Sequence, residues 1–143
     1  MTSGPDNSLG FVLNRTNNKL KNALIQILKP YDITPEQWGT LKRLWQQDGI
    51  SPKCIAELTF KDQPTTVRIL KKLEKKGLIF REVNLADNRS YLIYLTDRGK
   101  ELKDILIPLT EKKLKEVLKG IDQQEVQKLL EILNSWTVKS SQP

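Results

Sequence analysis

The sequence predicts a mainly α-helical protein with one small β-hairpin, built as a single domain over residues 1–143. Apolar residues recur every three or four positions through 9–30, most of 34–77 and 96–137, which is typical of helices that bury one face. Only between Ile79 and Leu95 does the period shorten to two, as in a β-ribbon with one covered face. A chain of 143 residues has the usual length of one domain and can bury a sizeable core.

Three start signals define the helices of the central segment. The segment 34–37, Thr-Pro-Glu-Gln, combines an N-cap, a proline at the first helical position and a glutamine that can close a capping box. Ser51, followed by proline, starts a short helix in the same way. Asp62 can cap a third helix, which carries many of the lysines and ends at Gly77.

Long helices are predicted on both sides of this segment. The first is expected to run from Leu9 to Pro30. Thr96 caps a long helix that is expected to continue to Ile121, and Asp122 caps a last one. Between the two groups of helices, the hairpin is expected to turn over the polar segment 86–90. The flanking helices carry apolar stripes that the central segment is too small to cover, which favours dimerisation.

Composition excludes several classes of function. The chain has no histidine, so it lacks the commonest general base and metal ligand. Its single cysteine, Cys54, cannot form an intramolecular disulfide or a thiolate metal site. We therefore expect no catalytic site, no metal and no cofactor. No apolar run reaches the roughly 18 residues that a membrane span needs, so the expected location is the cytoplasm.

Charge and element order together favour a DNA-binding module. The net charge is +7, and between Ser51 and Lys100 eleven Lys and Arg stand against six Asp and Glu, a surplus of five. A helix, a short helix, a basic helix and a two-stranded ribbon follow one another as in a winged helix-turn-helix. In that module the basic helix fits the major groove of duplex DNA and the ribbon tip reaches an adjacent groove or the backbone.

Several short motifs agree with this order. They are Ile55-Ala56-Glu57, the segments 65–70 (Thr-Thr-Val-Arg-Ile-Leu) and 73–79 (Leu-Glu-Lys-Lys-Gly-Leu-Ile), 87–90 (Asp-Asn-Arg-Ser) and 95–99 (Leu-Thr-Asp-Arg-Gly). In their spacing the chain resembles the MarR family of bacterial transcription regulators, although Thr59 and Lys61 stand where many members carry apolar residues. The resemblance implies a winged-helix module over about 34–99 and dimerisation helices over about 9–30 and 100–137.

The resemblance also implies the roles of individual residues. At the ribbon tip, Arg89 would enter the minor groove and Asp87 would orient it. The residues expected in the major groove are Gln63, Thr65, Thr66 and Arg68, and those expected at phosphates are Lys61, Lys71, Lys72 and Arg98. The function that follows is a homodimeric DNA-binding regulator, expected to be a repressor, that recognises a palindromic operator.

An effector site is a further implication of the resemblance. Trp38 and Trp45 lie near one helical face and, with Phe11 and Leu13, could line a pocket for a small aromatic or amphipathic anion. Tryptophans in a small domain are more often core residues, and that alternative stays open. Cys54 could sense oxidants, but it lies in the first turn of the short helix, whereas relatives that sense through a cysteine carry it in the first helix.

Two other functions compete with duplex binding. A winged helix can serve as a protein-interaction module without nucleic acid, in which case the protein would show no salt-sensitive binding to duplex DNA. RNA binding is a weaker alternative, because the predicted ribbon lacks the exposed aromatic side chains that stack on bases.

Overall fold

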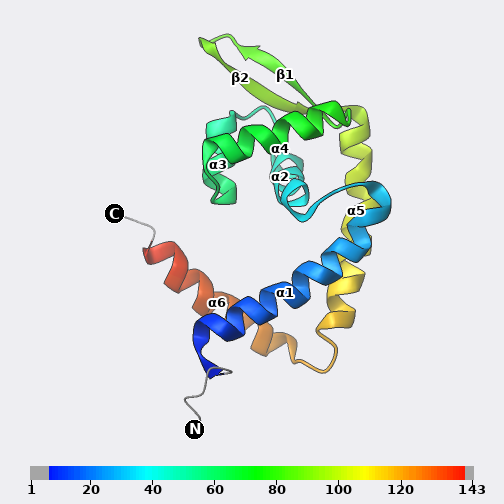
Figure 1. The fold of residues 1–143 in the computed structure, drawn as a ribbon, viewed down its shortest axis with the longest axis vertical. Coiled ribbons are helices and arrows are strands. Elements are labelled where there is room, and N and C mark those ends of the chain that lie inside the picture. Colours follow the sequence, from blue (N-terminus) through cyan, green and yellow to red (C-terminus); the bar gives the residue numbers. More distant parts are fainter. Residues whose placement is uncertain (1–6, 141–143) are drawn as a thin grey trace.

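The computed structural model describes residues 7–140, and side chains up to Val138. Helices and one antiparallel hairpin follow one another along the chain (Figure 1). The elements are α1 (Leu9–Leu28), the short 3₁₀ helix η2 (Lys29–Tyr31), α2 (Pro35–Gln46), α3 (Pro52–Thr59), α4 (Gln63–Lys75), β1 (Ile79–Asn84), β2 (Asp87–Leu95), α5 (Asp97–Val117) and α6 (Gln123–Ser140). The mainly α-helical fold with one hairpin is therefore confirmed.

The predicted helix starts are confirmed by their capping hydrogen bonds. Thr34 Oγ1 accepts from the backbone N–H of Gln37 at 3.1 Å, and Gln37 Oε1 accepts from the N–H of Thr34 at 3.2 Å, which completes the capping box of α2. Ser51, Asp62 and Thr96 cap α3, α4 and α5 with single bonds of 3.1, 2.7 and 3.1 Å. Local side-chain chemistry thus determines where these helices begin.

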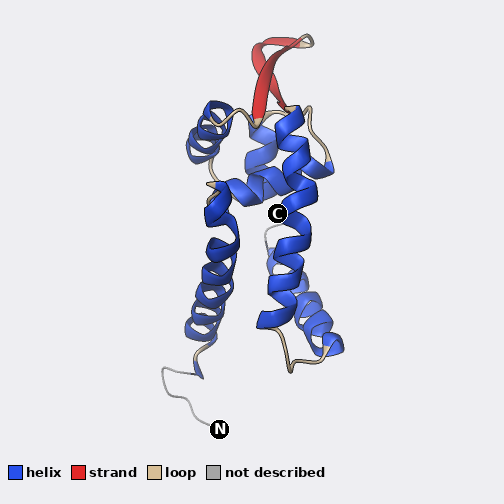
Figure 2. Cartoon of the chain, turned by 90° about the vertical axis from the view of Figure 1, so that its right-hand side faces the viewer, coloured by secondary structure: helices blue, strands red, loops and turns tan. Residues whose placement is uncertain are grey.

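Helices α2, α3 and α4 and the hairpin form one lobe, from which α1 and α5 extend (Figures 1 and 2). The centre of the lobe is apolar, and Leu41, Ile55 and Leu73 are each 0% exposed. Leu28 of α1 and Leu106 of α5, also 0% exposed, join the same cluster. The two long helices are therefore fixed to the lobe where they leave it, while their far ends lie away from the core.

The wing is a hairpin with a partial third strand. Ile79 pairs with Leu95 at its base, and the ladder continues to Val83 opposite Tyr91. Ile50 adds an antiparallel bridge to Ile93, which is completely buried. Because this edge is covered, the base of the wing is fixed to the lobe and only its outer half extends freely.

The tip of the wing differs from the prediction. The turn lies at 85–86 rather than at 86–90, and Asp87 already pairs with Asn84 as the first residue of β2. The reason is local, because Asn84 Oδ1 accepts from the N–H of Ala86 at 3.0 Å and closes the turn early. The register shifts between Val83 and Asn84, where a bulge interrupts the ladder. The segment 87–90 is therefore strand.

Two helix ends also differ from the prediction. The first helix stops at Leu28, and the chain continues as η2 instead of reaching Pro30 in α-helical form. The long helix stops at Val117, four residues before Ile121, because Gly120 adopts a φ of +91° in the connection to α6. Apolar spacing continues across both ends, so periodicity alone could not place them.

Phe60, the residue directly after α3, carries backbone strain without burial. Its φ is +56°, and it closes α3 with bonds from its own N–H and that of Lys61 to the carbonyls of Glu57 and Ala56. This left-handed position usually holds glycine, and an L-residue there costs about 1 kcal/mol or more. The side chain is 79% exposed, so burial does not offset the strain.

We expect Phe60→Gly to be more stable than Phe60→Ala by about 0.5 to 1 kcal/mol in urea unfolding. Both variants lose the same exposed ring, but only glycine relieves the clash of the Cβ with the backbone. Equal stabilities would show that the turn is not strained at this position.

Candidate nucleic-acid interface

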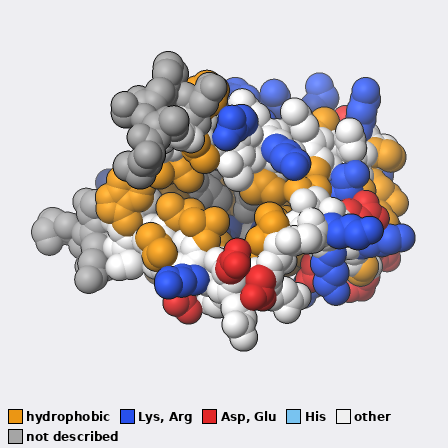
Figure 3. Space-filling model, turned by 90° about the horizontal axis from the view of Figure 1, so that it is seen from below, with side chains coloured by type: hydrophobic (Ala, Val, Ile, Leu, Met, Phe, Trp, Pro, Cys, Tyr) orange, Lys and Arg blue, Asp and Glu red, His pale blue; other side chains and the backbone are white. Residues whose placement is uncertain are grey.

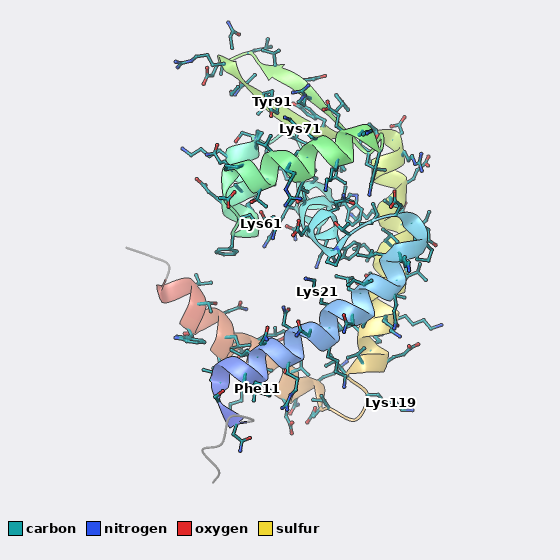
Figure 4. All side chains as sticks on the ribbon, viewed as in Figure 1. Phe11, Lys21, Lys61, Lys71, Tyr91 and Lys119 are labelled. Carbon is teal, nitrogen blue, oxygen red and sulfur yellow. The ribbon has the colours of Figure 1, made fainter. Side chains whose placement is uncertain are left out.

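Helix α4 presents a basic outer face. Its apolar residues Ile69, Leu70 and Leu73 are buried against the lobe. The outward-facing residues are exposed and mainly cationic, and they are Gln63, Pro64, Arg68, Lys71, Lys72 and Lys75. In Figure 4, Lys61 lies at the turn before α4 and Lys71 lies on α4. A polyanion is the natural partner of such a face.

The first turn of α4 is fixed by Asp62. Hydrogen bonds from the backbone N–H and the hydroxyl of Thr65 lower the pKa of the Asp62 carboxyl, and the Arg68 guanidinium lowers it further. Because this pKa is lowered by folding, the stabilisation is present above the ordinary value of 3.8 and is lost as the pH falls through the lowered one. The cap is therefore intact at neutral pH.

Thr66 is a core residue and not an interface residue, contrary to the prediction. It is 1% exposed, and its hydroxyl donates to the backbone carbonyl of Asp62 at 2.9 Å. Position 66 lies on the buried side of the helix, one turn before Leu70. Thr65 is half-buried at the edge of the outer face, so of the two threonines it alone remains accessible.

Arg68 is held by an acidic residue of another helix. Its Nη2 lies 3.5 Å from Oε2 of Glu36 in the first turn of α2. Both side chains are about half exposed. The guanidinium is thus directed by its partner and still accessible to a ligand.

The tip of the wing presents a braced arginine. Asp87 Oδ1 accepts from the backbone N–H of Arg89 at 3.1 Å and lies 3.5 Å from its Nε. The Arg89 side chain is 94% exposed. These two contacts place the carboxylate against the base of a side chain that extends from the tip.

Two of the predicted phosphate contacts lie outside α4, near its two ends. Lys61 is partly buried in the turn before the helix, whereas Arg98 lies near Lys76 at the opposite end, beside Tyr31 and Asp32. Lys75 was not among the predicted contacts, although it is exposed one turn beyond Lys71. Its helical spacing from Lys71 is the signal that could have identified it.

A separate cavity of about 310 Å³ lies between α1, α2 and α5. Its walls are largely apolar, with cations at Lys42 and Lys113, and it is lined by Leu20, Ala23, Leu24, Ile27, Trp38, Lys42, Ile107, Thr110, Glu111, Lys113, Leu114 and Val117. Of the four residues predicted to line an effector pocket, it includes only Trp38.

The other three residues occupy different places. Trp45 packs edge-on against Trp38 with ring centroids 5.4 Å apart and donates its indole N–H to the Gly99 carbonyl at 2.8 Å. Phe11 lies nine residues before Leu20, the first α1 residue in the cavity wall, which is about 13 Å along the helix. Leu13 lies two residues after Phe11, on the same side of Leu20. Within this chain, therefore, Phe11 and Leu13 are not brought to the cavity.

The fold and this face define a winged helix-turn-helix DNA-binding protein. The model of the MarR family matches residues 33–91. The HTH-type transcriptional regulator SarZ of Staphylococcus epidermidis is 32% identical over 113 residues, which are 79% of this chain and 75% of SarZ. The chain belongs to the MarR family. It is accordingly a transcriptional regulator and not an enzyme.

Solved structures agree with this assignment. The S. aureus MepR–DNA complex matches with a TM-score of 0.83 at 27% identity, over 92% of this chain and 98% of MepR. CouR from Rhodococcus jostii RHA1, bound to p-coumaroyl-CoA, has the same fold, with a TM-score of 0.84 at 22% identity over 94% of each chain. None of the described helices is long and apolar enough to cross a membrane.

Proposed function

We propose that the protein is a homodimeric repressor that binds a palindromic operator in duplex DNA. The observation that carries this proposal is the pairing, in one lobe, of the basic outer face of α4 with the braced Arg89 at the wing tip. A helix of this kind fits the major groove, and an exposed arginine on a ribbon suits the narrow minor groove beside it. A regulator that binds chromosomal DNA in this way would act in the cytoplasm.

The surface of the flanking helices supports the dimer. No side chain of α6 between Gln123 and Val138 is buried, and large apolar residues such as Leu129 and Ile132 are about half exposed. Exposed apolar residues also occur on α1 and α5, and hydrophobic side chains surround a hollow on this face (Figure 3). Exposed apolar side chains gathered on one face favour association. A two-fold dimer presents two equal modules and so selects an inverted repeat.

Roles for the contact residues follow from their positions on α4. Gln63, Thr65 and Arg68 lie in its N-terminal half and would read base edges. Lys71, Lys72 and Lys75 continue the outer face and would neutralise phosphates. Lys61 would bind a phosphate at the turn, and Arg98 would do so only where the DNA reaches the end of α4.

We also propose that the cavity between α1, α2 and α5 binds a small aromatic or amphipathic anion that releases the DNA. Trp38 and the leucines of α1 offer apolar walls. The Lys42 Nζ atom lies 5.7 Å from the centroid of the Trp38 ring. An apolar pocket with a few polar groups suits such a ligand, and two lining lysines, Lys42 and Lys113, against one carboxylate, Glu111, favour an anion.

The wing provides the direct test of DNA binding. Arg89→Ala is expected to weaken binding about tenfold. It should also lower the slope of log affinity against log salt by about one unit per subunit, because the variant removes one cation that would lie close to the phosphates. Asp87→Ala should weaken binding less, because the positive charge stays while its support is removed. Fluorescence anisotropy titrations over a series of salt concentrations measure both quantities.

Lys112→Ala is the matched control, since it removes one exposed cation from α5, outside the wing and α4. It should leave the salt slope unchanged. Tighter binding by Asp87→Ala together with an unaffected Arg89→Ala would contradict the minor-groove role. Absence of any salt-sensitive binding by the wild-type protein would instead favour the protein-interaction module.

A further inference from the structure

The first turn of α2 contacts the recognition helix α4 at two points. Glu36 pairs with Arg68 in the middle of α4, as described above. The next residue, Gln37, accepts a hydrogen bond at its Oε1 from Lys76 Nζ at 2.7 Å, at the C-terminal cap of α4. Lys76 also lies 3.6 Å from Oδ2 of Asp32, in the corner that precedes α2. The turn thus holds α4 at its middle and at its end.

The backbone that carries Glu36 is fixed. Proline occupies the preceding position, and the capping box between Thr34 and Gln37 closes around Glu36. Gln37 is only 3% exposed, so its contacts are made inside the protein. The Glu36 carboxylate therefore acts from an anchored turn, unlike a carboxylate on a loop.

Arg68 is the residue most dependent on such support. It is the only cation in residues 63–70, the half of α4 proposed to read bases, and the next cation is Lys71. An arginine side chain has several rotatable bonds, and its ordering at the moment of binding opposes affinity. A carboxylate that orders it beforehand removes part of that cost.

We propose that Glu36 is a positioning residue that directs Arg68 for base readout and so contributes to operator specificity. The inference rests on the proposed DNA binding. A carboxylate beside the DNA face repels phosphates and weakens binding to every sequence. Its favourable contribution arises only where Arg68 meets its correct base, so Glu36 strengthens discrimination and lowers general affinity.

These two effects have opposite signs, which the variant Glu36→Gln separates. The variant keeps the shape and removes the charge. Its affinity for unrelated duplex is expected to rise, and its affinity for the preferred duplex to fall, so that the ratio of the two falls about threefold to tenfold. The fold should persist, because an ion pair between half-exposed side chains contributes little to stability.

The experiment compares the full-length protein on two probes at one salt concentration. The first is the duplex that the wild-type protein enriches from a random-sequence library, and the second is the same duplex with its sequence shuffled. Glu57→Gln is the matched control: Glu57 is an exposed carboxylate on α3 without an ion pair in the described chain. It should leave the ratio of affinities unchanged.

Two further variants test the mechanism. Glu36→Asp keeps the charge but shortens the side chain, so it should lower the ratio without raising affinity for the shuffled duplex. In an Arg68→Ala background, Glu36→Gln should no longer change the ratio, because the residue that it positions is absent. Thermal unfolding of each variant tests whether a lowered ratio of affinities for the preferred and the shuffled duplex comes from loss of the fold.

The inference is overturned if Glu36→Gln leaves the ratio unchanged, as Glu57→Gln does, since Glu36 would then act only by repulsion. It is also overturned if Glu36→Gln lowers the ratio equally in the absence of Arg68. A wild-type protein that enriches no sequence contradicts the proposed function itself, and the inference with it.

Discussion

Gly99→Ala is expected to destabilise the protein by about 3 kcal/mol or more. A Cβ at position 99 would lie 2.2 Å from the backbone oxygen of Leu78, far inside van der Waals contact. That carbonyl cannot withdraw easily, because it accepts a hydrogen bond from the N–H of Thr96 at 3.0 Å. The Gly99 carbonyl is also fixed by the indole N–H of Trp45. Relief of the clash must therefore move α5 away from the base of the wing.

Urea or thermal unfolding measures this effect, and Gly39→Ala is its control. Gly39 lies inside α2, and a Cβ there would meet no atom within 4 Å. Alanine at position 39 should therefore stabilise the helix by up to about 1 kcal/mol. Similar changes at the two positions would contradict the close approach of α5 to Leu78.

Deletion of 122–143 is expected to abolish dimerisation. If the monomer is not stable on its own, the deletion is expected to abolish folding as well. Removal of α6 takes away exposed apolar residues such as Leu129 and Ile132, which the proposed dimer would bury against its partner, and leaves the half-exposed Ile105 and Leu114 of α5 uncovered. Sedimentation equilibrium should give the full chain a mass about twice its 16.5 kDa.

A point variant separates loss of the dimer from loss of the fold. Ile132→Glu places a charge on the exposed apolar side of α6 and should shift the full chain towards monomer. Lys128→Glu changes a polar, exposed position of the same helix and should leave the mass unchanged. A soluble, monodisperse wild-type monomer would contradict the dimer and the palindrome together.

Features determined by neighbouring residues could be predicted from the sequence. Thr34, Ser51, Asp62 and Thr96 cap their helices because each needs only its own side chain and a backbone N–H three residues on. The turn of the wing is equally local, but it lies at 85–86 and not at 86–90. Charged residues at 87–90 resemble a turn, whereas Asn84 closes the chain before they begin.

Features that join distant residues could not be predicted. The register of α4 turns Thr66 inward, where its hydroxyl returns to the backbone, so its polar nature is a misleading signal. Glu36 and Arg68 are far apart in sequence, and neither residue indicates the other. The cavity likewise depends on how α1 and α5 cross, and Trp38 alone among the predicted residues lies in its wall.

The first turn of α2 places three different environments on consecutive residues. Glu36 pairs with Arg68 of α4, Gln37 accepts a hydrogen bond from Lys76 at the C-terminal cap of α4, and Trp38 forms part of the cavity wall. Because successive helical residues rise by only about 1.5 Å, a shift of this turn would carry all three residues together. A displacement of this turn would therefore reach both the cavity wall at Trp38 and the contacts to α4. If the cavity binds the ligand proposed above and both ligand and DNA shift this turn, thermodynamic linkage makes the effect reciprocal: DNA would change the affinity for the ligand by the same factor by which the ligand changes the affinity for DNA.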